Sequence, residues 1–443
     1  MAAALFSRPF FLVYRTLWNL LLPFLKRRPR LADGWRERLI PEDWLHQPSS
    51  PCSGRPIDIW LQASSGGEAR LALAICQKFN AALPMRVLIT TWTRQGRDII
   101  EKAIPTLQST HPCLSILVRF APLDHPDIAR KAVSMASPRV MVLLETELWP
   151  SLLAGCREKH IPVHVFNGRI TKSTIRFGKM FSSLMNEISP LSIHAVSSHD
   201  QSGFQSIFPC TVGIMPNIKF DLAAQNLKSH LSDQFCLSGT RNPVFLFASV
   251  RECEEVRIPG QLKRIYQSVP HAAVIIVPRH LHRTESWKSV LEDLGFSVVL
   301  ASDLLPNQPL PRKHILIWNR FGDLPHLYAA AGAVFVGGSF GQGGQNFLEA
   351  LSAGCVPCIG PSASNFLWAI TSESRALPSL EATSLLRIAH TPKEVIDIML
   401  DEAAHVSDRA AIREKFQNWL APRLGGALFT ARHIEKDAQL FNS

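Results

Sequence analysis

Two short stretches in the N-terminal half carry carboxylates where a catalytic group would be useful. In the first, Leu-Gln-Ala-Ser-Ser-Gly-Gly-Glu, a strand expected over residues 57–62 ends in a Ser/Gly turn, and Glu68 opens a helix. A carboxylate at a helix N-terminus is stabilised by the helix dipole, so we expect Glu68 to stay ionised. Two roles stay open for it: a helix cap, or a general base that takes a proton from a hydroxyl group.

The second stretch is Leu-Leu-Glu-Thr-Glu-Leu-Trp-Pro, in which Glu145 and Glu147 follow an apolar strand expected over residues 140–144. A buried carboxylate is costly unless it has a partner or a chemical role. The purely structural alternative is an ion pair with a nearby arginine such as Arg169.

A glycine-dense turn dominates the C-terminal half. An apolar run at 333–336 precedes five glycines within 337–344, a helix-like segment at 346–353 and a second strand at 356–359. Glycine lets the backbone approach a phosphate closely, and a strand–loop–helix turn presents N–H groups to an anion. Glu349, in the first helical turn, could bind ribose hydroxyls. The pattern predicts a nucleotide or phosphate ligand.

Two basic residues could support such a ligand. Arg279, in Val-Pro-Arg-His, follows a strand expected over 273–277 and would suit a bidentate phosphate clamp, although a solvated loop arginine is the alternative. Lys219, in Asn-Ile-Lys-Phe-Asp, precedes a polar stretch and could reach a ligand between two domains.

Two other motifs carry less weight. Gly337-Gly-Ser-Phe-Gly341 matches the G-x-S-x-G of α/β hydrolases, but there the helix begins directly after the serine, whereas here the loop continues to Gly344. Cys355 and Cys358 form a C-x-x-C with no second pair or histidine cluster, so we favour a buried apolar role.

Short apolar runs alternate with helical stretches, once from residue 57 and again from residue 244. This alternation predicts an α/β fold with two doubly wound Rossmann-like domains facing a central cleft, where ligands bind at the carboxyl ends of the strands. The expected division is an N-terminal amphipathic helix with a basic flank, an N-terminal domain, a polar linker, a C-terminal domain, and a C-terminal helix that could pack back on the N-terminal domain: residues 1–30, 31–222, 223–242, 243–420 and 421–443.

The N-terminal segment is apolar from residue 10 to residue 25, but Arg15, Asn19 and Pro23 make it too broken for a spanning helix. A helical wheel places one apolar face together: Phe11, Tyr14, Trp18, Leu21, Leu22 and Leu25. With the basic run that follows, this predicts a helix lying in a membrane interface. A helix docked on its own domain and a single uncleaved span are the alternatives.

The amino-acid composition limits the classes of partner and compartment that suit this protein. The net charge of +11 favours an anionic partner, but no basic-aromatic module supports nucleic-acid binding. Nine scattered cysteines, an odd number, favour a reducing compartment over a disulfide framework.

Taken together and in this order, these stretches resemble the 3-deoxy-D-manno-octulosonic acid (Kdo) transferases of lipopolysaccharide assembly, which have a GT-B fold. The resemblance covers roughly residues 10–370. The motifs that carry it are Trp35-Arg-Glu-Arg38, Ser65-Gly-Gly-Glu68, Glu145-Thr-Glu-Leu-Trp-Pro150, Asn167-Gly-Arg169, Ile218-Lys-Phe-Asp221, Val277-Pro-Arg-His280, Gly322-Asp-Leu324 with Tyr328, and Gly343-Gly-Gln-Asn-Phe-Leu-Glu349.

By this resemblance Glu68 is the general base, and Glu145 and Lys219 stabilise the transition state. The resemblance also implies a CMP site in the C-terminal domain, formed by Pro278, Arg279, Phe321, Gly322, Asp323, Asn346, Phe347, Leu348 and Glu349.

Several positions depart from the family pattern, all on the donor side. The usual histidine before Asn346 is Gln345, and the usual proline after it is Phe347. The usual Thr-His-Glu-Gly-Glu-Glu loop is Val250-Arg-Glu-Cys-Glu-Glu255, and Asp323 replaces a glutamate. These departures put the donor geometry in question more than the acceptor chemistry.

The resemblance implies inverting, metal-independent transfer of Kdo from CMP-Kdo to the lipid A precursor lipid IVA, with no cofactor besides this donor substrate. It places the protein at the anionic cytoplasmic face of the inner membrane of a Gram-negative bacterium, with no nucleic-acid partner. The alternative hypothesis, suggested by Gln345, Phe347 and the altered 250–255 loop, is a catalytically weakened sugar-nucleotide-binding or assembly protein of the same fold.

Overall fold

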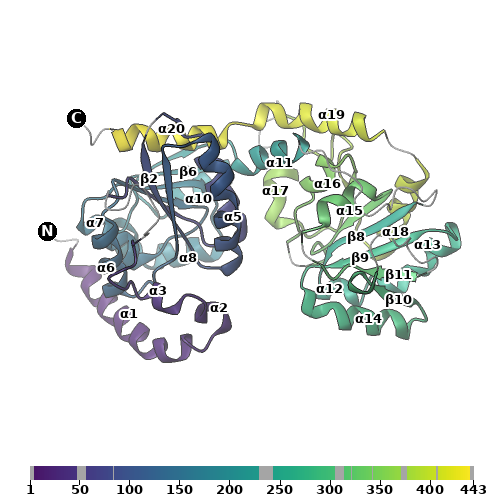
Figure 1. Cartoon of the computed structure of the whole chain (residues 1–443), viewed down its shortest axis with the longest axis horizontal. Coiled ribbons are helices and arrows are strands. Elements are labelled where there is room, and N and C mark those ends of the chain that lie inside the picture. Colours follow the sequence, from purple (N-terminus) through teal and green to yellow (C-terminus); the bar gives the residue numbers. More distant parts are fainter. Residues whose placement is uncertain are drawn as a thin grey trace. The chain divides into compact units, whose positions relative to one another are not determined.

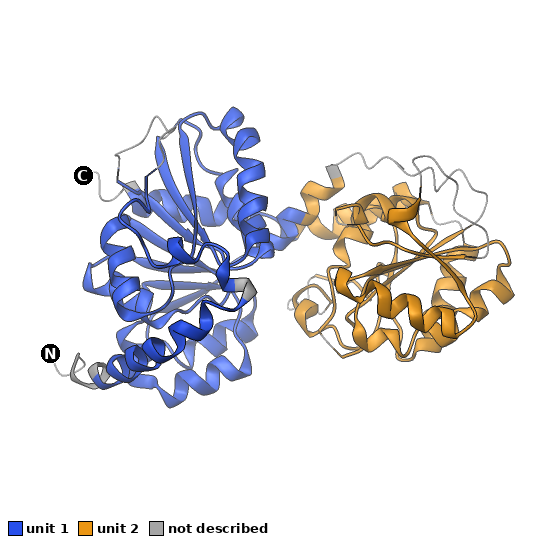
Figure 2. Ribbon diagram, turned by 60° about the horizontal axis from the view of Figure 1, so that its bottom comes forward, with its two compact units in different colours: residues 1–222, 423–443 blue, residues 223–422 orange. Residues whose placement is uncertain are grey.

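The chain forms two compact α/β units in the computed structural model (Figures 1 and 2). Unit 1 comprises residues 1–222 and 423–443, and unit 2 comprises residues 223–422. The described residues are 4–46, 56–82, 84–228, 243–304, 314–320, 322–341, 343–370, 377–405 and 408–439. Most of the expected linker (229–242) and the expected CMP-site residue Phe321 therefore lie outside them.

Unit 1 contains a seven-stranded parallel sheet in the order β3-β2-β1-β4-β5-β6-β7. Within this sheet the chain runs from β1 outward through β2 to β3, and then returns to the other side of β1 as β4. The turns that follow β1 and β4 therefore leave the sheet at its switch point, where α/β sheets bind ligands. The strands are β1 (Ile59–Gln62), β2 (Met85–Thr91), β3 (Leu114–Phe120), β4 (Val140–Leu144), β5 (Val163–Gly168), β6 (Ser192–Ala195) and β7 (Thr211–Ile214).

Unit 2 repeats the plan with the order β10-β11-β9-β8-β12-β13-β14. Here the order reverses between β8 and β12, so the turns after these strands lie at the second switch point. The strands are β8 (Val244–Val250), β9 (Ala273–Pro278), β10 (Ser297–Leu300), β11 (His314–Ile317), β12 (Ala333–Val336), β13 (Pro357–Ile359) and β14 (Arg387–Ile388). The expected α/β class with two doubly wound sheets is confirmed.

Two strands, β7 and β14, were not predicted from the pattern of apolar runs. Both are short edge strands: three of the four β7 residues and both β14 residues are at least partly exposed. A short strand with at most one buried residue leaves no apolar run to detect in the sequence.

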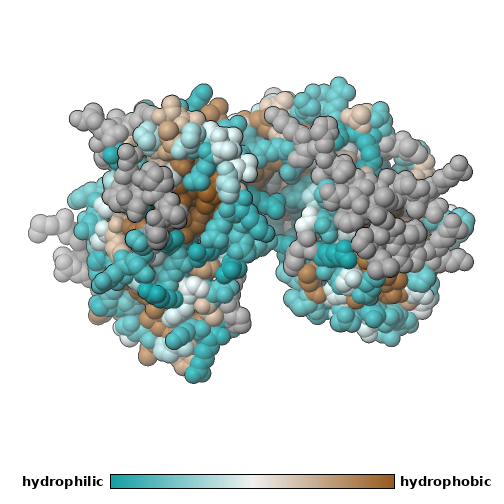
Figure 3. Space-filling model, viewed as in Figure 1, coloured by the Kyte–Doolittle hydropathy of each residue, from teal (hydrophilic) through white to brown (hydrophobic). Residues whose placement is uncertain are grey.

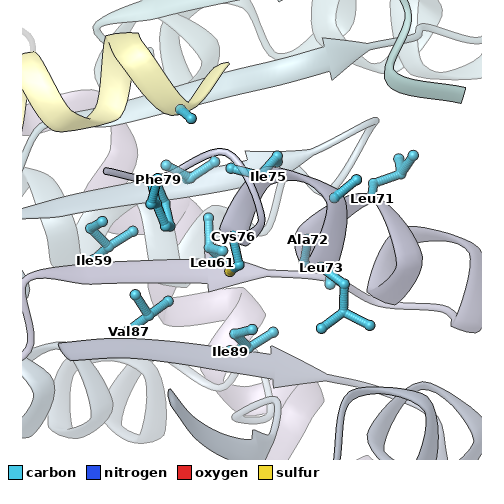
Figure 4. Close-up of a cluster of buried hydrophobic side chains, with 14 of the residues drawn as sticks. Ile59, Leu61, Leu71, Ala72, Leu73, Ile75, Cys76, Phe79, Val87 and Ile89 are labelled. Atoms are coloured by element: carbon cyan, nitrogen blue, oxygen red, sulfur yellow. The ribbon is translucent and has the colours of Figure 1, made fainter. Parts of the chain in front are cut away.

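Alternate residues of β1 enter two different cores of unit 1. Ile59 and Leu61 point to the face covered by α4 (Gly66–Cys76) and α20 (Gly426–Gln439), as Figure 4 shows for the α4 side. Trp60 points to the opposite face and packs edge-on against Trp44. Two-sided burial explains why β1 is a continuous apolar run and fixes its register, so the turn after it is held rigidly.

Helices cover both faces of each sheet. Those of unit 1 include α1 (Ala4–Leu25), α2 (Pro29–Ala32), α3 (Trp35–Arg38), α5 (Arg94–Thr110), α6 (Pro126–Ala136), α7 (Pro150–Glu158), α8 (Lys172–Met180), α9 (Ser182–Glu187) and α10 (Ser198–Gln205). The unit boundary falls within α11 (Ile218–Lys228). Those of unit 2 include α12 (Glu252–Glu255), α13 (Lys263–Ser268), α14 (Thr284–Asp293), α15 (Leu324–Ala330), α16 (Leu348–Ser352), α17 (Leu367–Ile370), α18 (Pro392–Ala404) and α19 (Arg409–Leu420).

The helix α1 docks on unit 1 through the face that we expected to enter a membrane. Tyr14 donates a hydrogen bond to Asp124 (2.9 Å), and the Phe10 ring packs against Phe181. The expected orientation of α1 is therefore wrong. The helix is apolar on two sides, and one of them packs against unit 1. The other side forms an exposed outer stripe of Leu12, Val13, Leu17, Leu20 and Phe24. Leu21, which we expected on the membrane face, is also exposed. None of the described helices combines the length and apolar character needed to cross a bilayer.

Candidate active site

Glu68 sits in the first turn of α4, directly beyond β1. Its backbone N–H donates to the hydroxyl of Ser65, the N-cap residue (3.3 Å). Its carboxyl group accepts hydrogen bonds from the Ser64 backbone N–H (2.6 Å) and the Ser65 hydroxyl (3.0 Å). These bonds hold the carboxyl group at the carboxyl end of the sheet, so the capping geometry orients Glu68 rather than excluding a chemical role for it.

Burial raises the pKa of Glu68 to about 8, and repulsion from Glu147 and Glu145 adds to the shift. Our expectation that helix-dipole stabilisation keeps this group ionised is wrong, because desolvation and like charge outweigh the dipole and the two serine hydrogen bonds. A carboxylate with a pKa close to the working pH is a strong enough base to take a hydroxyl proton. Glu68 therefore has the properties of a general base that becomes active in mildly alkaline conditions.

Glu147 is linked to Glu68 through Ser64. The Ser64 hydroxyl donates to Glu147, and the indole N–H of Trp149 donates to the same carboxylate oxygen (2.6 Å). Burial raises the pKa of Glu147 as well. Ser64 thus contacts both glutamates, with its backbone N–H on one and its hydroxyl on the other. Glu147 was noticed in the sequence but given no role, because nothing local indicates that its carboxylate turns toward Glu68.

Glu145 pairs with Lys219 across unit 1, with 2.5 Å between Nζ and Oε1. The arginine partner suggested by the sequence, Arg169, contributes only its backbone carbonyl, which accepts from Thr146. Glu145 directly follows β4 and has a left-handed backbone conformation (φ 58°). The structure thus brings together the three expected catalytic residues, Glu68, Glu145 and Lys219.

The start of α11 places Lys219. The side-chain oxygen of Asn167, near the end of β5, accepts from the backbone N–H of Ile218 (2.9 Å). The side-chain oxygen of Asn217 accepts from the N–H of Lys219 (3.0 Å). Asn167 is fully buried and left-handed (φ 56°), a conformation that asparagine tolerates better than most residues. The Asn-x-Arg and Lys-Phe-Asp motifs thus meet because one caps the helix that carries the other.

In unit 2, the glycine-dense turn binds an anion, but that anion is an internal side chain. The carboxyl group of Glu254, which is fully buried, accepts from the backbone N–H groups of Gly338 (2.9 Å), Ser339 (3.0 Å) and Phe340 (3.3 Å). A fourth N–H, from Arg251, donates to it as well (2.7 Å). The expectation that these amides contact a phosphate is therefore wrong, and sequence reasoning missed Glu254.

The expected CMP residues after β12 divide into exposed and buried side chains. The Asn346 side chain is exposed and donates to Glu349 (2.9 Å). The side chains of Phe347 and Leu348 are buried, so they could contact a ligand only through their backbone. α16 begins at Leu348 and has five residues, too few for the helix-dipole contribution that we expected from a longer segment.

The remaining expected CMP residues lie beyond β9 and before α15. Arg279 directly follows Pro278, the buried last residue of β9. Burial and the nearby Arg251 lower the pKa of Arg279, whereas Glu349 acts in the opposite direction. Gly322 is left-handed (φ 96°), and Asp323 accepts from the indole N–H of Trp318 (3.1 Å) at the start of α15.

Alternative chemistries find no support in these contacts. Ser339 is fully buried, and its hydroxyl donates to Val336 and accepts from Gly360, so it is not an exposed nucleophile. Cys355 and Cys358 are buried free thiols, as the sequence predicted. Within the described residues, no three His, Cys, Asp or Glu side chains gather in a way that could hold a metal ion.

Known proteins resemble this chain in sequence and in fold. Residues 33–222 match the family model described as 3-deoxy-D-manno-octulosonic-acid transferase (kdotransferase). The chain is 27% identical over 436 residues to the 3-deoxy-D-manno-octulosonic acid transferase of Bordetella pertussis, covering 96% of this chain and 97% of that protein. It is 28% identical over 375 residues to the probable mitochondrial 3-deoxy-D-manno-octulosonic acid transferase of Arabidopsis thaliana, covering 81% and 80% respectively.

Two solved structures share the fold at low sequence identity. Anabaena HepE in complex with UDP-glucose is 14% identical with a TM-score of 0.54, covering 86% of this chain and 98% of that one. A glycosyltransferase from Rickettsia africae is 12% identical with a TM-score of 0.54, covering 88% and 100%. These likenesses support the GT-B fold class.

Proposed function

Because this chain belongs to the Kdo transferase family of glycosyltransferases, we propose that it moves Kdo from CMP-Kdo to the lipid A precursor lipid IVA in lipopolysaccharide biosynthesis. The observation that carries this proposal is the Glu68–Ser64–Glu147 chain of contacts beside the Glu145–Lys219 ion pair. This set supplies both a base of suitable pKa and a fixed pair of charges.

In the proposed mechanism, Glu68 takes the proton of the attacking acceptor hydroxyl as that oxygen bonds to the anomeric carbon of Kdo. The bond between this carbon and the CMP phosphate breaks through an oxocarbenium-like state, whose positive charge Glu145 stabilises. Lys219 holds Glu145 in place, at 2.5 Å. Direct attack assisted by one base implies inversion at the anomeric carbon with no covalent intermediate.

The donor is proposed to bind unit 2 beyond β9 and β12. Arg279 would clamp the phosphate of CMP, and Asn346 and Glu349 would bind ribose hydroxyls. A single phosphate needs few cationic partners, so the proposed reaction requires neither a metal ion nor a further cofactor. Leaving-group charge would be neutralised by the arginine side chain as the phosphate departs.

The central test is a transfer assay with the full chain, CMP-Kdo and lipid IVA, with the product identified by its mass. A product heavier than lipid IVA by one or more Kdo units supports the proposal. Binding of CMP-Kdo without transfer to any lipid A precursor would instead favour the weakened, sugar-nucleotide-binding alternative.

We also propose that the protein associates with the anionic cytoplasmic face of the inner membrane through α1. Its outer stripe is strongly exposed, with Leu17 at 51%, Leu20 at 64% and Phe24 at 67%, and Lys26, Arg27 and Arg28 follow it. In the region where Figure 1 places α1, Figure 3 shows hydrophobic patches among hydrophilic surface. Apolar burial and attraction between basic side chains and anionic lipids would act together.

A double substitution in the outer stripe tests this membrane contact. Leu17→Ser with Leu20→Ser should weaken binding to phosphatidylglycerol-containing vesicles by at least about tenfold, because each leucine contributes about 1.5–3 kcal/mol when fully buried. Thr16→Ala, on an exposed position of the same helix, is the matched control. Vesicle binding unaffected by the double substitution would contradict the proposal. Deleting residues 1–25 is a less specific test of membrane binding, because the deletion also exposes Asp124 and Phe181 of unit 1.

A further inference from the structure

Arg251 follows β8 at the second switch point, and Arg279 follows the neighbouring strand β9. Val250 and Pro278 are register partners at the ends of β8 and β9, and each is followed by one of the arginines. The backbone N–H of Arg279 donates to the carbonyl of Val250 (2.8 Å), which fixes the two chains next to each other. Among the described residues, the Arg279 guanidinium has no ion-pair or hydrogen-bond partner.

Two of the acidic residues that follow Arg251 in sequence already accept several hydrogen bonds. Glu254 accepts the four backbone N–H groups described above. Glu255 accepts from Arg283 through both carboxylate oxygens (3.0 and 2.5 Å). Glu349 is the acid that acts on Arg279, and it also accepts from Asn346. Two neighbouring cations repel each other, and an anionic ligand bound by both would relieve this repulsion.

Two departures from the family sequence pattern meet at this place. A Cβ added to Gly338 would lie 3.5 Å from Cδ of Arg251 and 3.0 Å from Nε2 of Gln345, so both side chains pack over the same glycine. Arg251 and Gln345 each stand where the family motif has histidine. They are far apart in sequence, but both lie beside Gly338 in the structure.

The proposed donor carries two negative charges that match two arginines. In CMP-Kdo the anomeric carbon bears both the phosphodiester oxygen and the sugar carboxylate, so the two anions are only a few ångströms apart. Arginine binds phosphate and carboxylate equally well through its planar fork. We propose that Arg279 holds the phosphate and that Arg251, with Gln345 beside it, holds the sugar carboxylate and so selects donors with an acidic group on the anomeric carbon.

This proposal rests on the proposed function, and one set of binding measurements separates the two. Equilibrium binding of CMP and of CMP-Kdo is compared for the full chain and three variants. Arg251→Gln should weaken CMP-Kdo binding by about 10- to 100-fold, the range of a charge-assisted hydrogen bond, and change CMP binding by less than about threefold. Arg279→Ala should weaken both ligands by about 10- to 100-fold. Arg257→Gln, an exposed arginine just beyond α12, is the matched control and should change neither.

Each ligand is compared with its own wild-type value, because free CMP carries an extra charge on its terminal phosphate. Thermal unfolding of every variant checks that it folds. If Arg251→Gln does not fold, Arg251→Lys takes its place: it keeps the charge but loses the planar fork, so it should still weaken CMP-Kdo binding selectively, by a smaller factor.

Equal losses for CMP and CMP-Kdo in the Arg251 variant would assign Arg251 to the nucleotide and overturn the carboxylate assignment. Unchanged binding of both ligands would remove Arg251 from the site. Wild-type protein that binds neither ligand would instead overturn the proposed function itself, together with this assignment.

Discussion

In each unit a buried glutamate accepts hydrogen bonds at the carboxyl end of the sheet, and the surroundings of these two glutamates, Glu254 and Glu68, differ. Glu254 is fully enclosed and accepts four backbone N–H groups. Glu68 is 9% exposed, accepts from one backbone N–H and one hydroxyl, and feels the negative charge of Glu147 and Glu145. Backbone donors in sufficient number make a buried carboxylate a structural element, whereas few donors and acidic neighbours leave it poised to exchange a proton.

Removing the structural glutamate should have the largest effect. In Glu254→Ala the N–H groups of the glycine turn lose their acceptor, and breaking a buried charged interaction costs about 3–5 kcal/mol. We expect a loss of this size in the free energy of unfolding of unit 2 and loss of CMP binding, measured by denaturant unfolding and titration. Glu252→Ala, on the exposed side of α12, is the control. Wild-type stability in Glu254→Ala would show that the turn does not need its internal anion.

Replacing the chemical glutamate should act on rate and spare the fold. Glu68→Gln keeps the shape and removes the base, so transfer should fall by about 10²–10⁴-fold while CMP-Kdo binding stays nearly intact. Glu42→Gln, an exposed glutamate of the same unit, should behave like the wild type. Near-wild-type turnover in Glu68→Gln would show that Glu68 is only a helix cap and that both glutamates, Glu68 and Glu254, are structural.

The same variant should gain stability at alkaline pH. The pKa of Glu68 is about 8 in the folded chain against an ordinary value of 4.5, so the folded state binds the proton more tightly. The stability contributed by this proton is complete below pH 4.5 and is lost as the pH rises to about 8. Glutamine cannot ionise, so at pH 9 the Tm of Glu68→Gln should exceed that of the wild type, with little difference at pH 4.5. Equal Tm values at pH 9 would contradict the raised pKa.

The smallest expected effect is on the pH dependence of the rate. Because the base must be deprotonated, kcat/KM should rise about tenfold per pH unit and level off near pH 8. Glu147→Gln removes one of the charges that raise the pKa of Glu68, so the rise should move to lower pH. If the profile of Glu147→Gln matches the wild type, Glu147 is a structural partner of Ser64 and Trp149 and does not tune the base.

Local sequence determined much of this protein. The apolar runs fixed the position of most strands, because a strand buried on both faces must be apolar throughout. The glycine turn predicted close backbone approach to an anion, and Glu68 and Glu145 were singled out because carboxylates follow buried strands there. These features depend on neighbouring residues, so a single sequence contains them.

Only the tertiary structure determined which side chains pair with one another. Lys219, rather than Arg169, pairs with Glu145, and Glu254 fills the glycine turn across 84 residues of chain. The outward face of α1 and the raised pKa of Glu68 likewise depend on what packs against them. The physical reason is that the strand order brings distant turns together and that burial sets the energy of each charged group. Both depend on the whole fold and not on local periodicity.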